Sequence, residues 1–305
     1  MPSQIYRCLI LAFAAVATLT ACSGGGSKSD KQSSLDAPFA YDTSKPLQVR
    51  TNQKTRERGL EIRDISFKGA AGETVPAYLV LPRGKGRHPA AIYVHGSGGS
   101  RRDLLISAFG LAQRGAVSLA LDMNYSAERA PRTPPPQGIQ ALEAGTNNEI
   151  QSVVEVRRAV DLLRSFSYVD GDRIGYVGWS AGARIGAIVA GVDHRIEAFD
   201  LLSGGALPVS VYLADQPKDL RPKLEGFLIK TDPLRYAPHA APSALLFQDG
   251  RHDKVVPRKA LAGLARAGSK PKEVRWYDSG HVPSENAWAY SQRWLSNQLD
   301  LTRKA

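Results

Sequence analysis

The chain has 305 residues and a net charge of +11, with 40 lysines and arginines against 29 aspartates and glutamates. Its hydrophobic share of 43% is ample for a large core. The cations are spread along the chain and form no dense block interleaved with aromatic residues, which argues against a nucleic-acid-binding protein. We expect a solvated basic surface, with weak attraction to anionic envelope lipids or polysaccharide as the functional alternative.

The amino-terminal segment predicts export. One cation, Arg7, precedes an apolar run from Leu9 to Leu19, which is shorter than the roughly 20 residues of a membrane span and fits a signal peptide. Residues 19–22 (Leu-Thr-Ala-Cys) resemble the lipobox of bacterial lipoproteins. That resemblance implies a signal peptide over residues 1–21 and lipidation of Cys22. The mature protein would then be anchored to a bacterial membrane, facing the periplasm or exterior. An ordinary secretory signal is the alternative.

The rest of the chain predicts a tether and a single domain. Cys8 lies in the segment that would be removed, so the mature chain would keep only Cys22 and no intramolecular disulfide could form. Residues 22–45 begin with a Gly- and Ser-rich run and predict a flexible tether. Residues 46–305 are of the right length for one large α/β domain.

Apparent strands alternate with helical stretches from Ile62 onward, which predicts a mostly parallel sheet covered by helices on both faces. The clearest strands cover residues 90–94, 117–121, 173–177, 198–203, 244–248 and 274–277, and the clearest helices cover 102–114, 183–190 and 285–299. Two segments interrupt the alternation, residues 126–146 and 207–230. Both follow strands, so we expect small cap insertions over the active site, with plain surface loops as the alternative.

The most informative motif is Gly-Trp-Ser-Ala-Gly at residues 178–182, which lies between a predicted strand and a predicted helix. A G-x-S-x-G at such a turn is typical of a nucleophile elbow, and it makes Ser180 the candidate nucleophile. A tight structural turn is the rival interpretation. Trp179 is expected in the core or in the wall of the pocket.

A serine hydroxyl needs a base, and the base needs an acid that orients it. His281 follows the predicted strand 274–277, and Asp253 follows the strand that begins at Ala244. Both therefore lie at strand carboxyl ends, where open α/β sheets hold their chemistry. Asp249, four residues earlier, is the rival acid, and the loop position of Asp253 makes Asp253 the stronger candidate. His252, beside the acid, is expected to be solvated.

The loop after the strand 90–94, His-Gly-Ser-Gly-Gly at residues 95–99, predicts an oxyanion hole. Two backbone N–H groups must face the oxygen that becomes negative in acyl transfer. Ala181, the residue after the nucleophile, supplies one, and Ser97 supplies the other. His95 is expected to orient this loop.

Other chemistries find little support in the sequence. The Gly96-x-Gly98 pair lacks the third glycine of a dinucleotide fingerprint, because position 101 is arginine. There is no His-Glu-x-x-His, no Cys-x-x-Cys and no phosphate-binding loop motif. The sequence therefore predicts neither a cofactor nor a catalytic metal.

With these motifs, the chain from about Leu60 to Leu299 resembles the α/β-hydrolases, close to dienelactone-hydrolase-like and prolyl-oligopeptidase-like bacterial esterases. The resemblance implies an α/β-hydrolase fold and a cofactor-free serine esterase acting on a small-molecule ester. It also implies Ser180 as nucleophile, His281 as base and Asp253 as orienting acid, in that family's chain order. Ala183 departs from the family, where a glycine is common. The alternatives are a serine peptidase of the prolyl-oligopeptidase type and a non-catalytic envelope lipoprotein.

Overall fold

The computed structural model describes residues 35–129 and 136–301. The expected signal peptide and Cys22 lie outside these residues. Among the residues described, no helix is both long enough and apolar enough to cross a membrane.

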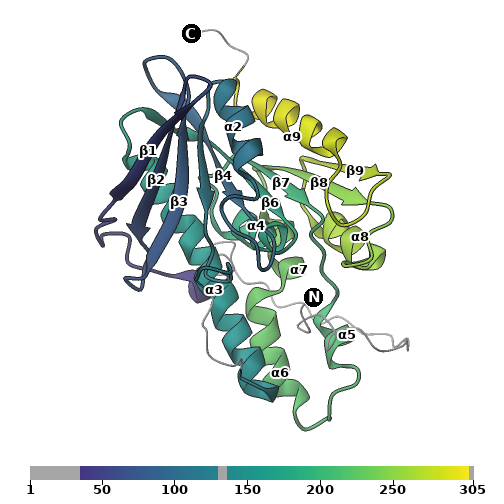
Figure 1. The fold of residues 1–305 in the computed structure, drawn as a ribbon. Coiled ribbons are helices and arrows are strands. Elements are labelled where there is room, and N and C mark those ends of the chain that lie inside the picture. Colours follow the sequence, from purple (N-terminus) through teal and green to yellow (C-terminus); the bar gives the residue numbers. More distant parts are fainter. Residues whose placement is uncertain (1–34, 130–135, 302–305) are drawn as a thin grey trace.

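A sheet of nine strands runs through the molecule in the order β1-β2-β3-β5-β4-β6-β7-β8-β9 (Figure 1). The strands are β1 (Arg50–Glu57), β2 (Leu60–Lys68), β3 (Thr74–Leu81), β4 (His88–Val94), β5 (Val117–Leu121), β6 (Val169–Trp179), β7 (Ala198–Leu202), β8 (Ala244–Gly250) and β9 (Lys272–Tyr277). β1, β2, β3 and β5 pair antiparallel, and every pair from β5 through β4 to β9 is parallel. The carboxyl ends of six neighbouring strands therefore meet at one edge of the sheet.

Helices cover both faces of the sheet, as the alternating pattern predicts. The longer helices are α2 (Leu105–Gln113), α3 (Gly138–Ser165), α4 (Ala181–Val192), α6 (Arg221–Leu228), α8 (Arg258–Ala267) and α9 (Glu285–Gln298). Shorter helical elements are α5 (Val209–Leu213), α7 (Pro233–Tyr236), η2 (Ala37–Phe39), η3 (Ile229–Thr231) and η4 (Ala237–His239). One core joins α3, α4 and α8 to the sheet, and a second core joins α2 and α9 to its other face.

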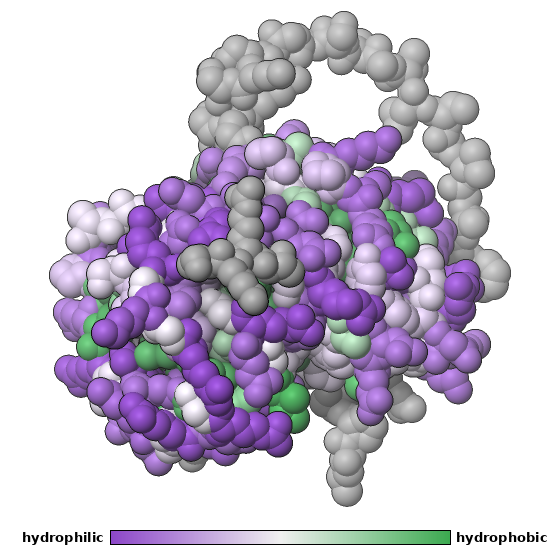
Figure 2. Space-filling model, turned by 90° about the horizontal axis from the view of Figure 1, so that it is seen from above, coloured by the Kyte–Doolittle hydropathy of each residue, from purple (hydrophilic) through white to green (hydrophobic). Residues whose placement is uncertain are grey.

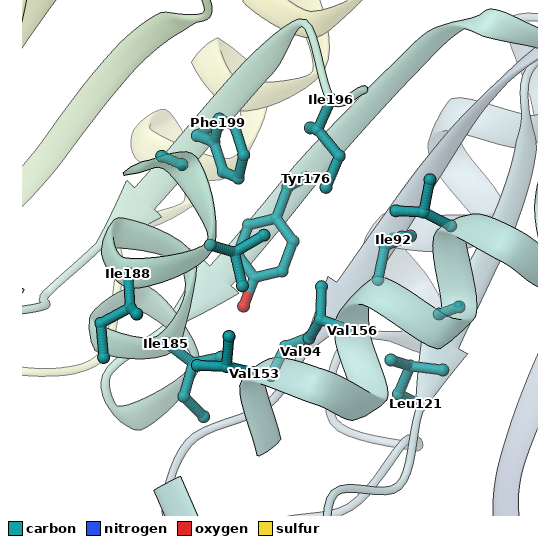
Figure 3. Close-up of a cluster of buried hydrophobic side chains, with 14 of the residues drawn as sticks. Ile92, Val94, Leu121, Val153, Val156, Tyr176, Ile185, Ile188, Ile196 and Phe199 are labelled. Atoms are coloured by element: carbon teal, nitrogen blue, oxygen red, sulfur yellow. The ribbon is translucent and has the colours of Figure 1, made fainter. Parts of the chain in front are cut away.

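The larger core holds the nucleophile helix against the sheet. Figure 3 shows Tyr176 of β6 among aliphatic side chains from β4, β5, α3 and α4. Its hydroxyl donates to the Gly182 carbonyl in the first turn of α4 at 2.7 Å. Burial of these chains stabilises the element that carries Ser180, at about 25 cal/mol per Å² of apolar surface.

Ordered packing begins earlier than the expected domain boundary. Residues 35–45 belong to the predicted tether, yet Leu35 and Phe39 are buried in the larger core, and the Phe39 ring lies edge-on to Tyr236 at 5.4 Å. The predicted boundary between tether and domain, at residue 45, is therefore too late by about ten residues. Two apolar side chains in this polar stretch pack against α3 and α7.

The surface is strongly polar. The face seen in Figure 2 is largely hydrophilic, and its hydrophobic areas are small and separate. Every residue of β1 is exposed, which agrees with a basic, solvated surface.

Candidate active site

Ser180 forms the turn between β6 and α4 and adopts a backbone conformation that side chains rarely take, with φ at 57° and ψ at −111°. Its N–H donates to the Leu202 carbonyl of β7 at 2.8 Å, which fixes the turn to the neighbouring strand. A non-glycine residue in this region is strained and persists only where its surroundings hold it. The elbow predicted from the motif is therefore present at the carboxyl end of β6.

The two motif glycines are required by close approach. A Cβ on Gly178 would lie 2.5 Å from the Gly182 backbone, and one on Gly182 would lie 2.2 Å from the Val94 carbonyl oxygen. At position 183, where relatives often carry glycine, this chain has alanine. The Ala183 Cβ packs against Gly204, and a Cβ added to Gly204 would lie only 2.4 Å from it. The departure at Ala183 is thus accommodated by a glycine after β7.

Three side chains from three strand ends form one hydrogen-bonded row. His281 Nε2 lies 2.9 Å from Ser180 Oγ, and His281 Nδ1 lies 2.8 Å from Asp253 Oδ2. The Asp253 side chain is 1% exposed and that of His281 is 16% exposed. With the proton on Nδ1 facing the carboxylate, Nε2 is free to accept the serine proton, which is the arrangement a serine nucleophile needs.

Asp253 is also held by its own loop. Its second oxygen, Oδ1, accepts the N–H groups of Val255 at 2.8 Å and Val256 at 2.9 Å. A carboxylate whose two oxygens both accept hydrogen bonds is held in one orientation. The acid therefore has a fixed position from which to orient His281.

Asp249, the rival acid, lies inside β8 and makes no hydrogen bond through either carboxylate oxygen. It is 2% exposed, and burial, followed by the nearby charge of Asp253, raises its pKa to about 8. The structure thus separates the two aspartates: one is paired to His281, and the other is a buried neutral acid at pH 7.

The predicted oxyanion donors are the N–H groups of Ser97 and Ala181. Neither donates to another backbone group in the described part of the chain. Ala181 begins α4, so its N–H is one of the unpaired donors at the positive end of a helix. A Cβ on Gly96 would lie 3.3 Å from the Ser180 Cβ, so the two turns are neighbours. The loop that carries Ser97 therefore lies next to the turn that carries Ser180 and Ala181.

His95 supports the oxyanion loop from inside. Its Nε2 accepts the Met123 N–H at 3.1 Å, so its proton lies on Nδ1, which is 2.7 Å from the Gly96 carbonyl oxygen. Burial lowers the pKa of this imidazole, which keeps it neutral. The Tyr125 hydroxyl donates to the His95 carbonyl at 2.7 Å. Sequence reasoning identified His95 but not Met123 or Tyr125, because their contacts depend on how the loop after β5 returns.

Trp179 has a role that its position in the motif does not reveal. Its Nε1–H donates to the His281 carbonyl at 3.1 Å, and the two rings lie 5.8 Å apart. The same indole borders Gly96, since a Cβ there would be 3.6 Å from Trp179 Cε3. One side chain therefore contacts both the loop of the base and the oxyanion loop.

The two expected cap segments differ. Residues 207–230 contain α5 and α6, which pack against each other, and α6 packs against α3. Of residues 126–146, those from Gly138 onward are the first turns of α3 and not a separate insertion, and 130–135 lie outside the described residues. Arg184 of α4 forms an ion pair with Glu149 of α3 at 2.9 Å, which links the helix that follows Ser180 to α3.

No group of three or more His, Cys, Asp or Glu side chains within residues 35–129 and 136–301 could hold a metal ion. His252 is exposed, as expected, and its Nε2 lies 2.6 Å from Asp278 Oδ1.

Comparison with known proteins places the chain that carries this site in a family. The family model described as acetyl xylan esterase (AXE1) matches residues 41–202, which is more than half of the chain and includes Ser180. A search of curated proteins found no match.

Solved structures share the fold at low sequence identity. The acetyl xylan esterase of a Paenibacillus species superposes with a TM-score of 0.69 at 21% identity, covering 88% of this chain and 92% of that one. Acetyl xylan esterase 1 of a Thermoanaerobacterium species gives 0.71 at 17% identity, covering 90% and 93%. A cold-adapted esterase from an Arctic intertidal metagenomic library gives 0.60 at 20% identity, covering 81% and 98%. The expected α/β-hydrolase fold is confirmed.

Proposed function

This chain belongs to the acetyl xylan esterase (AXE1) family and is a carboxylesterase-type serine hydrolase, and we propose that it removes acetyl groups from carbohydrate hydroxyls. The family match suggests the acetylated carbohydrate. The observation that carries the hydrolysis is the hydrogen-bonded row from Ser180 through His281 to Asp253. Those three residues supply the nucleophile, the base and the orienting acid of an ester hydrolase.

In the first half-reaction Ser180 Oγ attacks the ester carbonyl carbon while His281 Nε2 takes the hydroxyl proton. The carbonyl oxygen becomes negative and is held by the N–H groups of Ser97 and Ala181, each worth roughly 3–4 kcal/mol of barrier. When the C–O bond to the sugar breaks, His281 returns its proton to the leaving alcohol. An acetyl group then remains on Ser180 Oγ.

In the second half-reaction water replaces the sugar. His281 Nε2 takes a proton from the water, whose oxygen attacks the acetyl carbon and forms a second tetrahedral intermediate. Collapse of that intermediate breaks the bond to Ser180, which regains its proton from His281, and acetic acid leaves. Asp253 stabilises the imidazolium in both halves without itself being protonated.

Hydrolysis of p-nitrophenyl esters from acetate to decanoate tests this function. We expect turnover that is greatest for acetate and is lost in Ser180→Ala, while Ser210→Ala, at an exposed position of α5, retains it. Labelling by a fluorophosphonate should likewise require Ser180. Cleavage of peptides in place of all esters would favour the prolyl-oligopeptidase alternative. A folded protein that neither labels nor turns over would favour the non-catalytic lipoprotein.

We also propose that the enzyme is exported and lipid-anchored through Cys22, on the strength of the sequence at residues 19–22. An alkyne analogue of palmitate fed to expressing bacteria should label the wild type and Cys8→Ala but not Cys22→Ala. Label that persists in Cys22→Ala would refute the anchor.

A further inference from the structure

Four exposed cations gather on the loop that carries Asp253 and on the first turn of α8. This basic rim consists of Arg251, Lys254, Arg258 and Lys259. The only acidic residue between positions 251 and 259 is Asp253, whose oxygens are taken by His281 and by backbone N–H groups. No carboxylate of the described residues forms an ion pair with any of the four. The four cations are therefore exposed and no carboxylate of the described residues neutralises them.

The rim borders the catalytic row. The Arg251 N–H donates to the Tyr277 carbonyl at 2.8 Å and the His252 N–H donates to the Ser279 carbonyl at 3.0 Å. The loop of the acid thus runs alongside the loop of the base, and Lys254 directly follows Asp253. Because exposed charges act over a Debye length of about 8 Å at physiological ionic strength, cations on a loop beside the catalytic row can attract an anionic substrate.

Exposed apolar side chains lie on the same two loops. Val255 is 40% exposed beside Lys254, and Val282 is 66% exposed beside His281. The Arg258 guanidinium lies over the Trp276 ring, 5.0 Å from its centre. Small apolar side chains next to cations suit a sugar ring, which offers C–H groups on its faces and can carry a carboxylate at its edge.

A membrane surface fits this rim less well. The large hydrophobic side chains that are exposed in the described residues are all valine or isoleucine. Segments that insert into a lipid interface instead present tryptophan, phenylalanine or leucine. The rim has charge for a lipid headgroup, but the aromatic ring beside it, Trp276, is half-buried under Arg258.

We propose that the basic rim selects acetylated polysaccharides that carry carboxylate groups, such as polymers containing uronic acid units. The inference rests on the proposed esterase function and names its substrate class. Carboxylates of the polymer bind the rim and bring acetyl esters on nearby sugars to Ser180. The carboxylates themselves undergo no reaction.

The test compares acetylated glucuronoxylan with acetylated neutral arabinoxylan of equal acetyl content, and divides each rate by the turnover of p-nitrophenyl acetate. The rim variant is Arg251→Gln/Lys254→Gln/Lys259→Gln. The matched control, Arg50→Gln/Lys54→Gln/Lys85→Gln, removes three exposed cations from β1 and the β3–β4 loop. At low salt we expect the wild type and the control to prefer the acidic polymer. We expect the rim variant to lose about five-fold in kcat/KM on that polymer, and salt to lower the preference of the wild type.

Equal kcat/KM on the two polymers in the wild type would overturn the inference, as would an equal loss in the rim and control variants. Either result, with p-nitrophenyl acetate still hydrolysed, would leave the proposed esterase function intact. Failure of the wild type on every ester would instead refute that function. Rim-dependent binding to phosphatidylglycerol vesicles without any preference for the acidic polymer would assign the rim to a membrane and overturn the inference.

Discussion

Replacement of Asp249 by asparagine should stabilise the protein in a manner that depends on pH. The folded state holds this carboxyl in a site where burial raises its pKa to about 8, whereas its ordinary value is 3.8. Between those values the unfolded chain releases the proton and the folded chain keeps it. Folding therefore loses stability as the pH rises, by about 1.4 kcal/mol for each pH unit.

This loss of folding stability is absent below the pKa that Asp249 has in the unfolded chain. It reaches about 4 kcal/mol at pH 7 and becomes constant above the pKa that Asp249 has in the folded chain. Asparagine has nearly the same shape and cannot ionise, so Asp249→Asn escapes this loss. The free energy of unfolding of the variant, relative to the wild type, should rise by about 3 kcal/mol between pH 5 and pH 7.

Urea denaturation at pH 5, 6, 7 and 8 measures this difference. Asp219→Asn, at an exposed position between α5 and α6, is the control and should show no such trend. A difference between Asp249→Asn and wild type that stays constant from pH 5 to pH 8 would mean that Asp249 is ionised in the folded protein, and the reasoning would be refuted. Esterase activity should be retained, because His281 pairs with Asp253.

Three further substitutions test the site. Asp253→Asn should lower kcat about 10⁴-fold, as loss of an orienting carboxylate does in other serine hydrolases; a loss below ten-fold would reject Asp253 as the acid. Trp179→Phe keeps a ring beside His281 but removes the N–H that holds its carbonyl, so kcat should fall about three- to ten-fold with KM unchanged. A rise in KM alone would show that the indole serves substrate binding instead. Gly182→Ala would force a Cβ against the carbonyl at the end of β4 and should cost several kcal/mol of stability, measured by thermal unfolding. Gly145→Ala, with open space around it in α3, is its control and should be neutral or slightly stabilising.

The strands and helices with strongly apolar cores could be predicted from the sequence. β5 begins and ends where the apolar run 117–121 predicts, and β6, β8 and α4 appear around their predicted cores. β1 escaped prediction because its eight residues are polar and all exposed, so it carries no periodic signal and forms only by pairing with β2. Leu35 and Phe39 escaped for a similar reason, since two apolar residues in a polar stretch do not define an element.

The sequence by itself determined the elbow, because a strand, a tight turn and a helix depend on residues close together in the chain. It also supplied Ser180, Asp253 and His281 in an order that few folds share. Only the tertiary structure decided which aspartate meets His281, and that Trp179 and Met123 support the base and the oxyanion loop. These contacts join residues 28 to 102 positions apart. Their geometry depends on the register of β8 against β9 and of β4 against β5. Such registers follow from the packing of the whole core, which no local pattern encodes.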